Sequence, residues 1–307
     1  MIKRYTLKKI TITSFSLILL LIFSISTPKE FNYEIIDEDI KEQNVVYLLD
    51  NDNYVSKVIS YFDTKSIKEE VQKKLDILIN GDKSLNEFNS IIPKTTKINN
   101  IKLDKDNIYI DFSNDIKTIN KYIEEKMIES IVFTLTEIDG INNIYLTIEN
   151  NPYSELNNGK KINYPLTRDF GINKEYDITS LSNITKTTIY FTKEINDYKY
   201  YVPVTKINNI SSSKIDIIIS ELKSSVNAQN NLNSYVSNNL SLESYNIEDE
   251  TLTLVFNNYI FSDSNNNILE EVKYTISESI FENYNVEKVV FNTKNNTNIT
   301  TISKKSE

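Results

Sequence analysis

Apolar residues recur along the chain at two spacings, one typical of strands and one typical of helices. Residues 44–49 and 54–62 read as two strands, and the polar turn 50–53 between them predicts a hairpin. A helix then begins at Ser66, whose hydroxyl can cap the first turn while Glu69 reaches back. The apolar stripe predicted to face inward on this helix consists of Ile67, Val71, Leu75 and Leu78.

Two more strands, 98–103 and 108–112, precede a second helix from about residue 119 to 138, and a strand at 143–149 follows. A glycine closes each helix, as a left-handed cap requires. The inward positions of the second helix are Ile123, Met127, Ile128, Ile131, Leu135 and Ile138. The order ββαββαβ predicts an α+β domain with both helices on one face of a small mixed sheet.

The same order of elements recurs about 143–145 residues later, which indicates an internal duplication. The matching segments are 189–191, 199–204, a helix from Ser213, 251–256, a helix at 268–281 with Leu269, Val272, Ile276 and Ile280 inward, and 286–292. We therefore predict two tandem domains, at residues 44–182 and 183–298, with a flexible tail at 299–307.

The N-terminus carries an apolar run, residues 10–26, behind a basic flank. Its length lies at the short end of the roughly 17–25 residues that a spanning helix needs, and a basic flank stays in the cytoplasm. We favour an uncleaved membrane anchor at 1–27, a linker at 28–43, and both domains outside the cytoplasm. The alternative is a signal peptide cut after Ser26, since Ser24 and Ser26 supply the small residues that cleavage requires.

The composition of the chain limits the classes of function that it can have. The 307 residues are 39% hydrophobic and 25% charged, so a buried core is expected. A net charge of −9 makes nucleic acid an unfavourable partner. The chain has no His and no Cys, so it lacks the side chain that titrates near neutrality, the best nucleophile and the softest metal ligands. With only four Gly, a glycine-rich phosphate loop cannot be built. We predict no catalytic, cofactor or metal site.

Two acidic features of the sequence are candidate sites. The turn 50–53 begins like a calcium loop, but Val55 stands where Gly is required and Tyr61 where Glu is required, so a hairpin turn explains it better. Asp111 lies on the outward phase of its strand with no paired acid in view. We predict that Asp111 is a solvated surface residue.

Tyrosines and Asn-x-Ser/Thr sequences are frequent. Tyr109, Tyr145 and Tyr190 fall in the outer phase of strands, where an aromatic ring suits cross-strand packing or a protein interface. We expect packing for most of them, and retain Tyr109 and Tyr145 as interface candidates. The sequons at Asn183 and Asn209 are interpreted as chance matches in an Asn-rich chain.

Several stretches of the first copy resemble the GerMN domain of sporulation and spore-germination proteins. They are VVYLLDNDNYV (45–55), IIPKTTKI (91–98), IYIDFS (108–113), ESIVFTLTEIDGINNIYLTIEN (129–150) and PLTRDFGIN (165–173). The likeness covers the first copy and its C-terminal extension. The second copy keeps the order of elements but lacks the proline-containing loop and the Arg-Asp-x-Gly tail.

The resemblance implies tandem domains similar to ring-building motifs, held behind a membrane tether. It implies protein partners in the sporulation envelope, where the protein would help to assemble or stabilise a complex between mother cell and forespore. Members of this family typically carry a lipidated cysteine, so here the helix itself would be the tether. A module that binds peptidoglycan or another wall component is the alternative, and a hydrolase with paired Asp/Glu ranks third.

The most distinctive polar cluster lies in the extension, at Arg168, Asp169, Gly171 and Asn173. It is either a loop held onto the first domain by an Arg ion pair, or a contact surface between the domains or with a partner. The sequence leaves both interpretations open.

Overall fold

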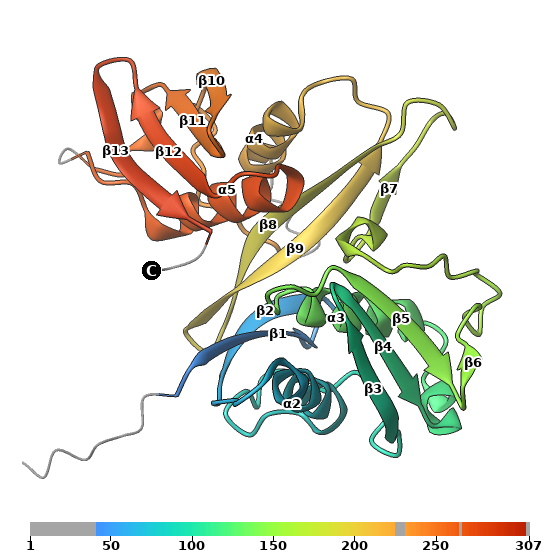
Figure 1. Ribbon diagram of the computed structural model, residues 1–307. Coiled ribbons are helices and arrows are strands. Elements are labelled where there is room, and N and C mark those ends of the chain that lie inside the picture. Colours follow the sequence, from blue (N-terminus) through green and yellow to red (C-terminus); the bar gives the residue numbers. More distant parts are fainter. Residues whose placement is uncertain (1–40, 225–230, 264–265, 305–307) are drawn as a thin grey trace, which may run out of the picture. The chain divides into compact units, whose positions relative to one another are not determined.

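The computed structural model describes residues 41–224, 231–263 and 266–304, in which two copies of one α+β arrangement follow each other (Figure 1). The first copy contains β1 (Gln43–Leu49), β2 (Val55–Tyr61), α2 (Ile67–Asn80), β3 (Ile98–Asp104), β4 (Asn107–Phe112), the 3-10 helix η1 (Asn114–Thr118), α3 (Glu124–Leu135), β5 (Asn143–Ile148) and β6 (Asn151–Pro152). Its extension holds the 3-10 helix η2 (Arg168–Phe170) and β7 (Glu175–Asp177).

The second copy repeats this order. It contains β8 (Thr185–Ile195), β9 (Tyr198–Asn208), α4 (Lys214–Ser224), β10 (Leu242–Glu248), β11 (Thr251–Phe256), the 3-10 helix η3 (Asn258–Ile260), α5 (Glu270–Asn283), β12 (Lys288–Thr293) and β13 (Asn296–Ser303). The predicted anchor at 1–27 and nearly all of the predicted linker lie outside the described residues. Within the described ranges, no helix is long and apolar enough to cross a membrane.

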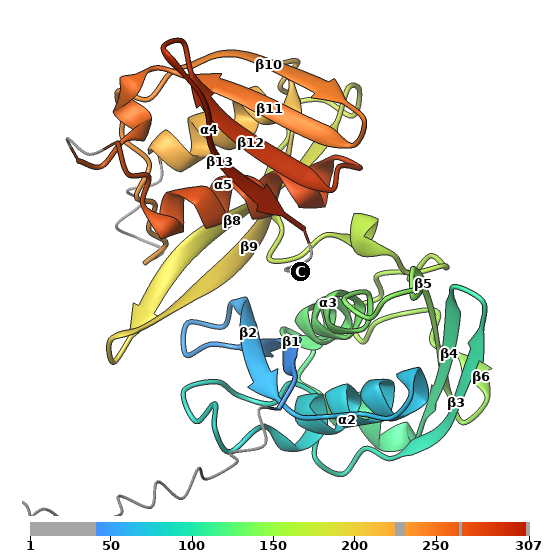
Figure 2. The same cartoon turned by 60° about the vertical axis from the view of Figure 1, so that its left-hand side comes forward.

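Each copy has three layers: the hairpin, the two helices, and a separate mixed sheet (Figures 1 and 2). The sheets have the orders β3-β4-β5-β6 and β10-β11-β12-β13, with β4 parallel to β5 and β11 parallel to β12. The expectation of a single sheet per copy, with the hairpin in it, was therefore wrong. Every residue from Met127 to Leu135 of α3 is buried. A helix buried on all sides needs a layer against each face, so the hairpin covers the face that the mixed sheet leaves open.

The helix signals were mostly correct. Ser66 accepts a hydrogen bond from the Glu69 amide at 3.2 Å, and Gly81 closes α2 with φ of 80°. Val71, Leu75 and Leu78 are fully buried as predicted, but Ile67 is 47% exposed because it is the first residue of the helix, at the end of the stripe. Leu269, the first residue predicted to point inward on the corresponding helix of the second copy, is the N-cap of α5 and is likewise partly exposed.

Two boundaries differ from those predicted. The second helix begins at Glu124 rather than near 119, because η1 and a turn occupy the preceding residues. Residues 296–303 form β13, which pairs with β12, so residues 299–303 are not the flexible tail that was expected. The predicted boundary between the domains at 182/183 stays a prediction.

The hairpins of the two copies share one sheet, in the order β1-β2-β9-β7 with β8 on the other side of β9. One edge of β9 is therefore covered by elements of the first copy and its extension. Lys57 of β2 pairs with Tyr201, and β7 pairs in parallel with residues 206–208. The two copies are thus joined through backbone pairing as well as side chains.

Candidate functional site

The residue singled out in the sequence, Arg168, lies at the start of η2, where the extension crosses between the copies. Thr167 caps this turn by accepting from the Asp169 amide. Gly171 ends it with φ of 77°, and a Cβ there would meet the Thr205 side chain of β9 at 3.2 Å. Both the backbone conformation and the close approach therefore require glycine at this position.

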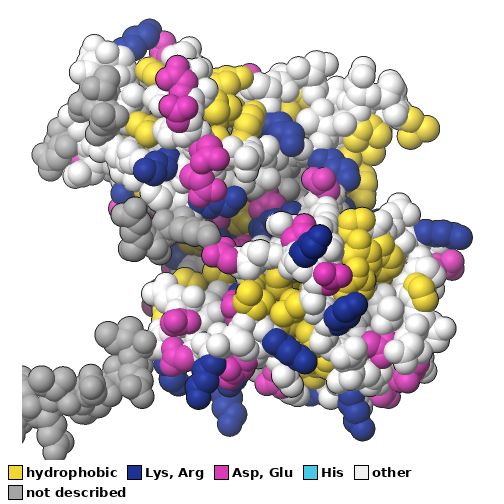
Figure 3. All heavy atoms as spheres, in the orientation of Figure 1, with side chains coloured by type: hydrophobic (Ala, Val, Ile, Leu, Met, Phe, Trp, Pro, Cys, Tyr) yellow, Lys and Arg dark blue, Asp and Glu magenta, His cyan; other side chains and the backbone are white. Residues whose placement is uncertain are grey.

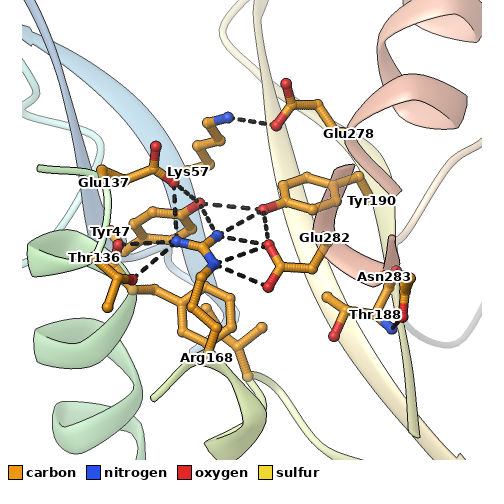
Figure 4. Close-up of polar contacts among 12 residues, drawn as sticks. Tyr47, Lys57, Thr136, Glu137, Arg168, Thr188, Tyr190, Glu278, Glu282 and Asn283 are labelled. Carbon is orange, nitrogen blue, oxygen red and sulfur yellow. Dashed lines mark hydrogen bonds and ion pairs between the residues drawn. The ribbon is translucent and has the colours of Figure 1, made fainter. Parts of the chain in front are cut away.

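Arg168 joins the two copies (Figure 4). Its Nε and Nη2 donate to the Glu282 carboxylate of α5 at 2.6–3.1 Å, while Nη1 donates to Thr136 at 3.1 Å and Glu137 at 3.2 Å. The guanidinium also lies over the Phe133 ring, 4.3 Å from its centroid. A planar fork that serves a bidentate pair on one side and further acceptors on the other is a geometry that only arginine provides.

Two equivalent tyrosines meet beside this arginine. Tyr47 of β1 and Tyr190 of β8 are buried, and their hydroxyls lie 3.2 Å apart. Tyr47 donates to Glu137 at 2.8 Å and Tyr190 to Glu282 at 3.3 Å, and the Arg168 guanidinium donates to both hydroxyls. Each copy therefore presents a Tyr–Glu pair, and one arginine from the extension connects the two pairs.

The electrostatic environment of the junction favours the ionised forms of Glu137 and Arg168. Burial alone would raise the pKa of Glu137, but the charges of Lys57 and Arg168 and the Tyr47 hydrogen bond lower it to about 2. Burial opposes the charge of Arg168 as well, yet Glu282, Tyr47 and Glu137 together raise its pKa well above the usual value. The Arg168 side chain is 28% exposed and that of Glu282 only 7%, so this is a partly buried ion cluster.

The lowered pKa of Glu137 predicts an acid-sensitive junction. A carboxylate with a folded-state pKa of about 2, against 4.5 ordinarily, contributes stability that is present above about pH 5 and is lost as pH falls toward 2. We expect a loss of about 2–3 kcal/mol over that window. Urea unfolding between pH 7 and 2.5 measures it. Glu137→Gln keeps the acceptor for Tyr47 and should flatten the profile; an unchanged slope in this variant would assign the effect to other carboxylates.

A second cation crosses from the first copy into the second. Lys57 of β2 binds Glu278 of α5 at 2.6 Å, with its ammonium 5.6 Å from the Tyr190 ring centroid and 5.5 Å from that of Tyr274. Tyr274 in turn stacks on Tyr201 of β9. Burial disfavours the ammonium, but Glu278 and the tyrosines raise the pKa of Lys57 above its usual value. Lys57 therefore stays charged, as a cation–π contact requires.

The Asn173 side chain links the backbones of the two copies by hydrogen bonds. Its Oδ1 accepts from the Val55 amide at 2.9 Å, and its Nδ2 donates to the carbonyls of Val55 and Pro203 at 2.8 Å each. Val55 and Pro203 lie next along the ladder from the pair Lys57 and Tyr201. Proline has no N–H to donate, so the Asn173 amide supplies the missing partner.

The side chains of the other three predicted interface residues take no part in these contacts. Asp169 is exposed, although its carbonyl accepts from Lys186 of the second copy. Tyr109 and Tyr145 stack at 4.7 Å on the outer face of β4 and β5, and Tyr164 stacks on Tyr145 at 5.9 Å. Figure 3 shows hydrophobic side chains gathered over this face. The structure brings Arg168 and Asn173 together at the junction but not the tyrosine pair.

Two residues expected at the surface are buried. Tyr190 is 1% exposed because the first copy covers its strand. Asp111 is 6% exposed and accepts from the Thr147 hydroxyl, the Asn99 amide and the Asn150 backbone. Burial would raise the pKa of Asp111, but these hydrogen bonds lower it. Asp111 therefore holds adjacent strands and a turn together.

Residues 50–53 form the hairpin turn between β1 and β2, as predicted. The Asn209 amide is engaged by the loop 179–182, accepting from two backbone amides and donating to the Ser180 and Ser182 carbonyls. Over the parts of the chain that are described, no group of three or more acidic side chains could hold a metal ion.

Sequence reasoning missed Glu137, Glu282 and Lys57. The sequence did contain a signal for the two glutamates. The duplication places Tyr47 and Tyr190 at equivalent positions, and it places a Glu near the end of the second helix of each copy. Residues repeated in both copies at non-core positions are candidates for a contact between the copies. Lys57 has no such signal, since its counterpart on β9 is Pro203.

The fold and the junction define a duplicated α+β protein whose two domains are joined through a shared sheet and an arginine-centred polar cluster. Residues 45–154 match the family described as "Germane: Sporulation and spore germination". The chain is 31% identical over 244 residues to the spore germination protein GerM of Bacillus subtilis, which covers 76% of this chain and 64% of that protein. The chain thus spans just under two thirds of the length of that relative.

The similarity extends to three dimensions. The solved structure of the tandem GerMN domains of GerM from Bacillus subtilis matches with a TM-score of 0.78 at 27% identity, covering 87% of this chain and 98% of that one. The chain belongs to the GerMN-domain family and carries two tandem GerMN domains.

Proposed function

We propose that this protein is a non-enzymatic assembly protein of the sporulation envelope, tethered to the membrane outside the cytoplasm. It would help to assemble or stabilise a complex between mother cell and forespore through protein partners. The observation that carries this proposal is the match of the whole tandem to that of a sporulation protein. The absence of His and Cys from the chain supports a role based on shape and surface rather than on nucleophilic or metal chemistry.

The exposed face of β4 and β5 is the proposed contact surface for a partner. The stacked rings of Tyr109, Tyr145 and Tyr164 are held by the sheet, and Tyr109 is 37% exposed. Rigid aromatic side chains supply contact area at low entropic cost, and they are enriched at interfaces. The Arg168 junction supports this surface indirectly, by keeping the two domains in one arrangement.

Deletion of the gene in its host, followed by counting of heat-resistant spores, tests the function. We expect spore yield to fall, the protein to fractionate with membranes, and membrane partners to co-purify with it from sporulating cells. Tyr109→Ser should reduce co-purification, whereas Tyr122→Ser, at a 79% exposed tyrosine outside the stack, should not. Normal sporulation in the deletion strain would contradict the proposal. Retention on purified cell wall without membrane partners would favour a wall-binding module instead.

A further inference from the structure

The two copies meet through equivalent positions. Tyr47 N–H donates to Thr134 on α3, and Tyr190 N–H donates to Ser279 on α5, so the two tyrosines hold the same place in their copies. Their hydroxyls contact each other across a separation of 143 residues. A position that meets its own counterpart lies close to a two-fold axis, so the hairpins are related by an approximate two-fold.

A second contact of this kind is a buried ion pair. Asp50 and Lys193 are also separated by 143 residues, and the Lys193 ammonium lies 2.8 Å from the Asp50 carboxylate. The side chains are 1% and 4% exposed. Asp50 is held in place by the amides of Asp52 and Tyr54 and by the Tyr200 hydroxyl. At this equivalent position the two copies carry opposite charges.

We propose that the hairpin face of the first copy is an interaction surface specific for the second copy, with Asp50 and Lys193 as the residues that exclude pairing of like copies. If two first copies met in the same way, Asp50 would face Asp50. If two second copies met, Lys193 would face Lys193. Like charges buried against each other are strongly unfavourable, whereas the observed pair is complementary. The surface is thereby reserved for contact within the chain, and partners must bind elsewhere. This inference does not depend on the proposed function.

A nicked form of the full chain tests the inference. Residues 176–184 are all exposed and Leu181 is 94% exposed, so a protease site can be inserted after Leu181. After cleavage, native mass spectrometry should find one N-terminal fragment with one C-terminal fragment, and no pairs of like fragments. The uncut insertion protein, checked by circular dichroism, is the folding control.

The charge is tested in the same nicked protein. Lys193→Glu leaves the Asp50 turn intact but places a second carboxylate against that of Asp50. It should raise the dissociation constant of the fragments about 100-fold or more. Lys288→Glu makes the same charge change at an exposed position of β12 and should leave the constant unchanged within about twofold. If Lys193→Glu fails to fold, Lys193→Met in the same assay should still weaken association at least tenfold. Pairs of like fragments, or Lys193 variants that associate as tightly as Lys288→Glu, would overturn the inference.

Discussion

Replacing Arg168 with alanine should lower the free energy of unfolding by about 3 kcal/mol, near the low end for removal of one partner from a buried ion cluster because the side chain is 28% exposed. The variant leaves the Glu137 and Glu282 carboxylates near each other without their shared cation. Both tyrosine hydroxyls also lose a donor. Urea unfolding at pH 7 followed by circular dichroism measures the change.

Matched variants separate charge from geometry in this experiment. Arg168→Lys keeps the charge but not the fork, and should recover only part of the loss. Asp169→Ala, at the exposed neighbouring residue, should change stability by less than about 0.5 kcal/mol. Adding Glu282→Gln to Arg168→Ala should restore some stability by removing one unpaired carboxylate. If Arg168→Ala unfolds like the wild type yet is lost from membrane complexes, the residue binds a partner rather than joining the domains.

Replacing Asn173 with alanine should destabilise the protein by about 3–4 kcal/mol. The Val55 N–H and the carbonyls of Val55 and Pro203 would be left buried without this partner, and each such group costs about 1–3 kcal/mol. Asn173 also has φ of 46°, a left-handed conformation in which asparagine is tolerated better than alanine. Thermal unfolding and hydrogen exchange at the Val55 amide report the loss.

Glycine at the same position separates the two causes. Asn173→Gly removes the amide but relieves the left-handed backbone, so it should be less destabilising than alanine by about 1 kcal/mol. Asn173→Asp keeps an acceptor for the Val55 amide and for the Lys126 ammonium, but it places a carboxylate oxygen beside two carbonyl oxygens, so it should recover only part of the loss. A negligible effect of Asn173→Ala would mean that water replaces the amide between β2 and β9.

Local signals identified most elements correctly. The cap at Ser66, the buried Val71, Leu75 and Leu78, and the hairpin turn at 50–53 each depend on neighbours within a few residues, which a single sequence displays. The duplication was visible for the same reason, because each copy repeats its own local pattern. Resemblance to GerMN domains then pointed to the extension that carries Arg168 and Asn173.

The sequence by itself determined the α+β class, the duplication and the candidate residues of the extension. Only the tertiary structure decided what those residues contact. Arg168 is separated from Glu282 by 114 residues and Asn173 from Val55 by 118, and such pairings depend on how two finished domains meet. Strand periodicity predicts which side chains point away from the core of their own domain. It does not predict whether water or another domain lies on that side. Tyr190, predicted to point outward, was buried for that reason.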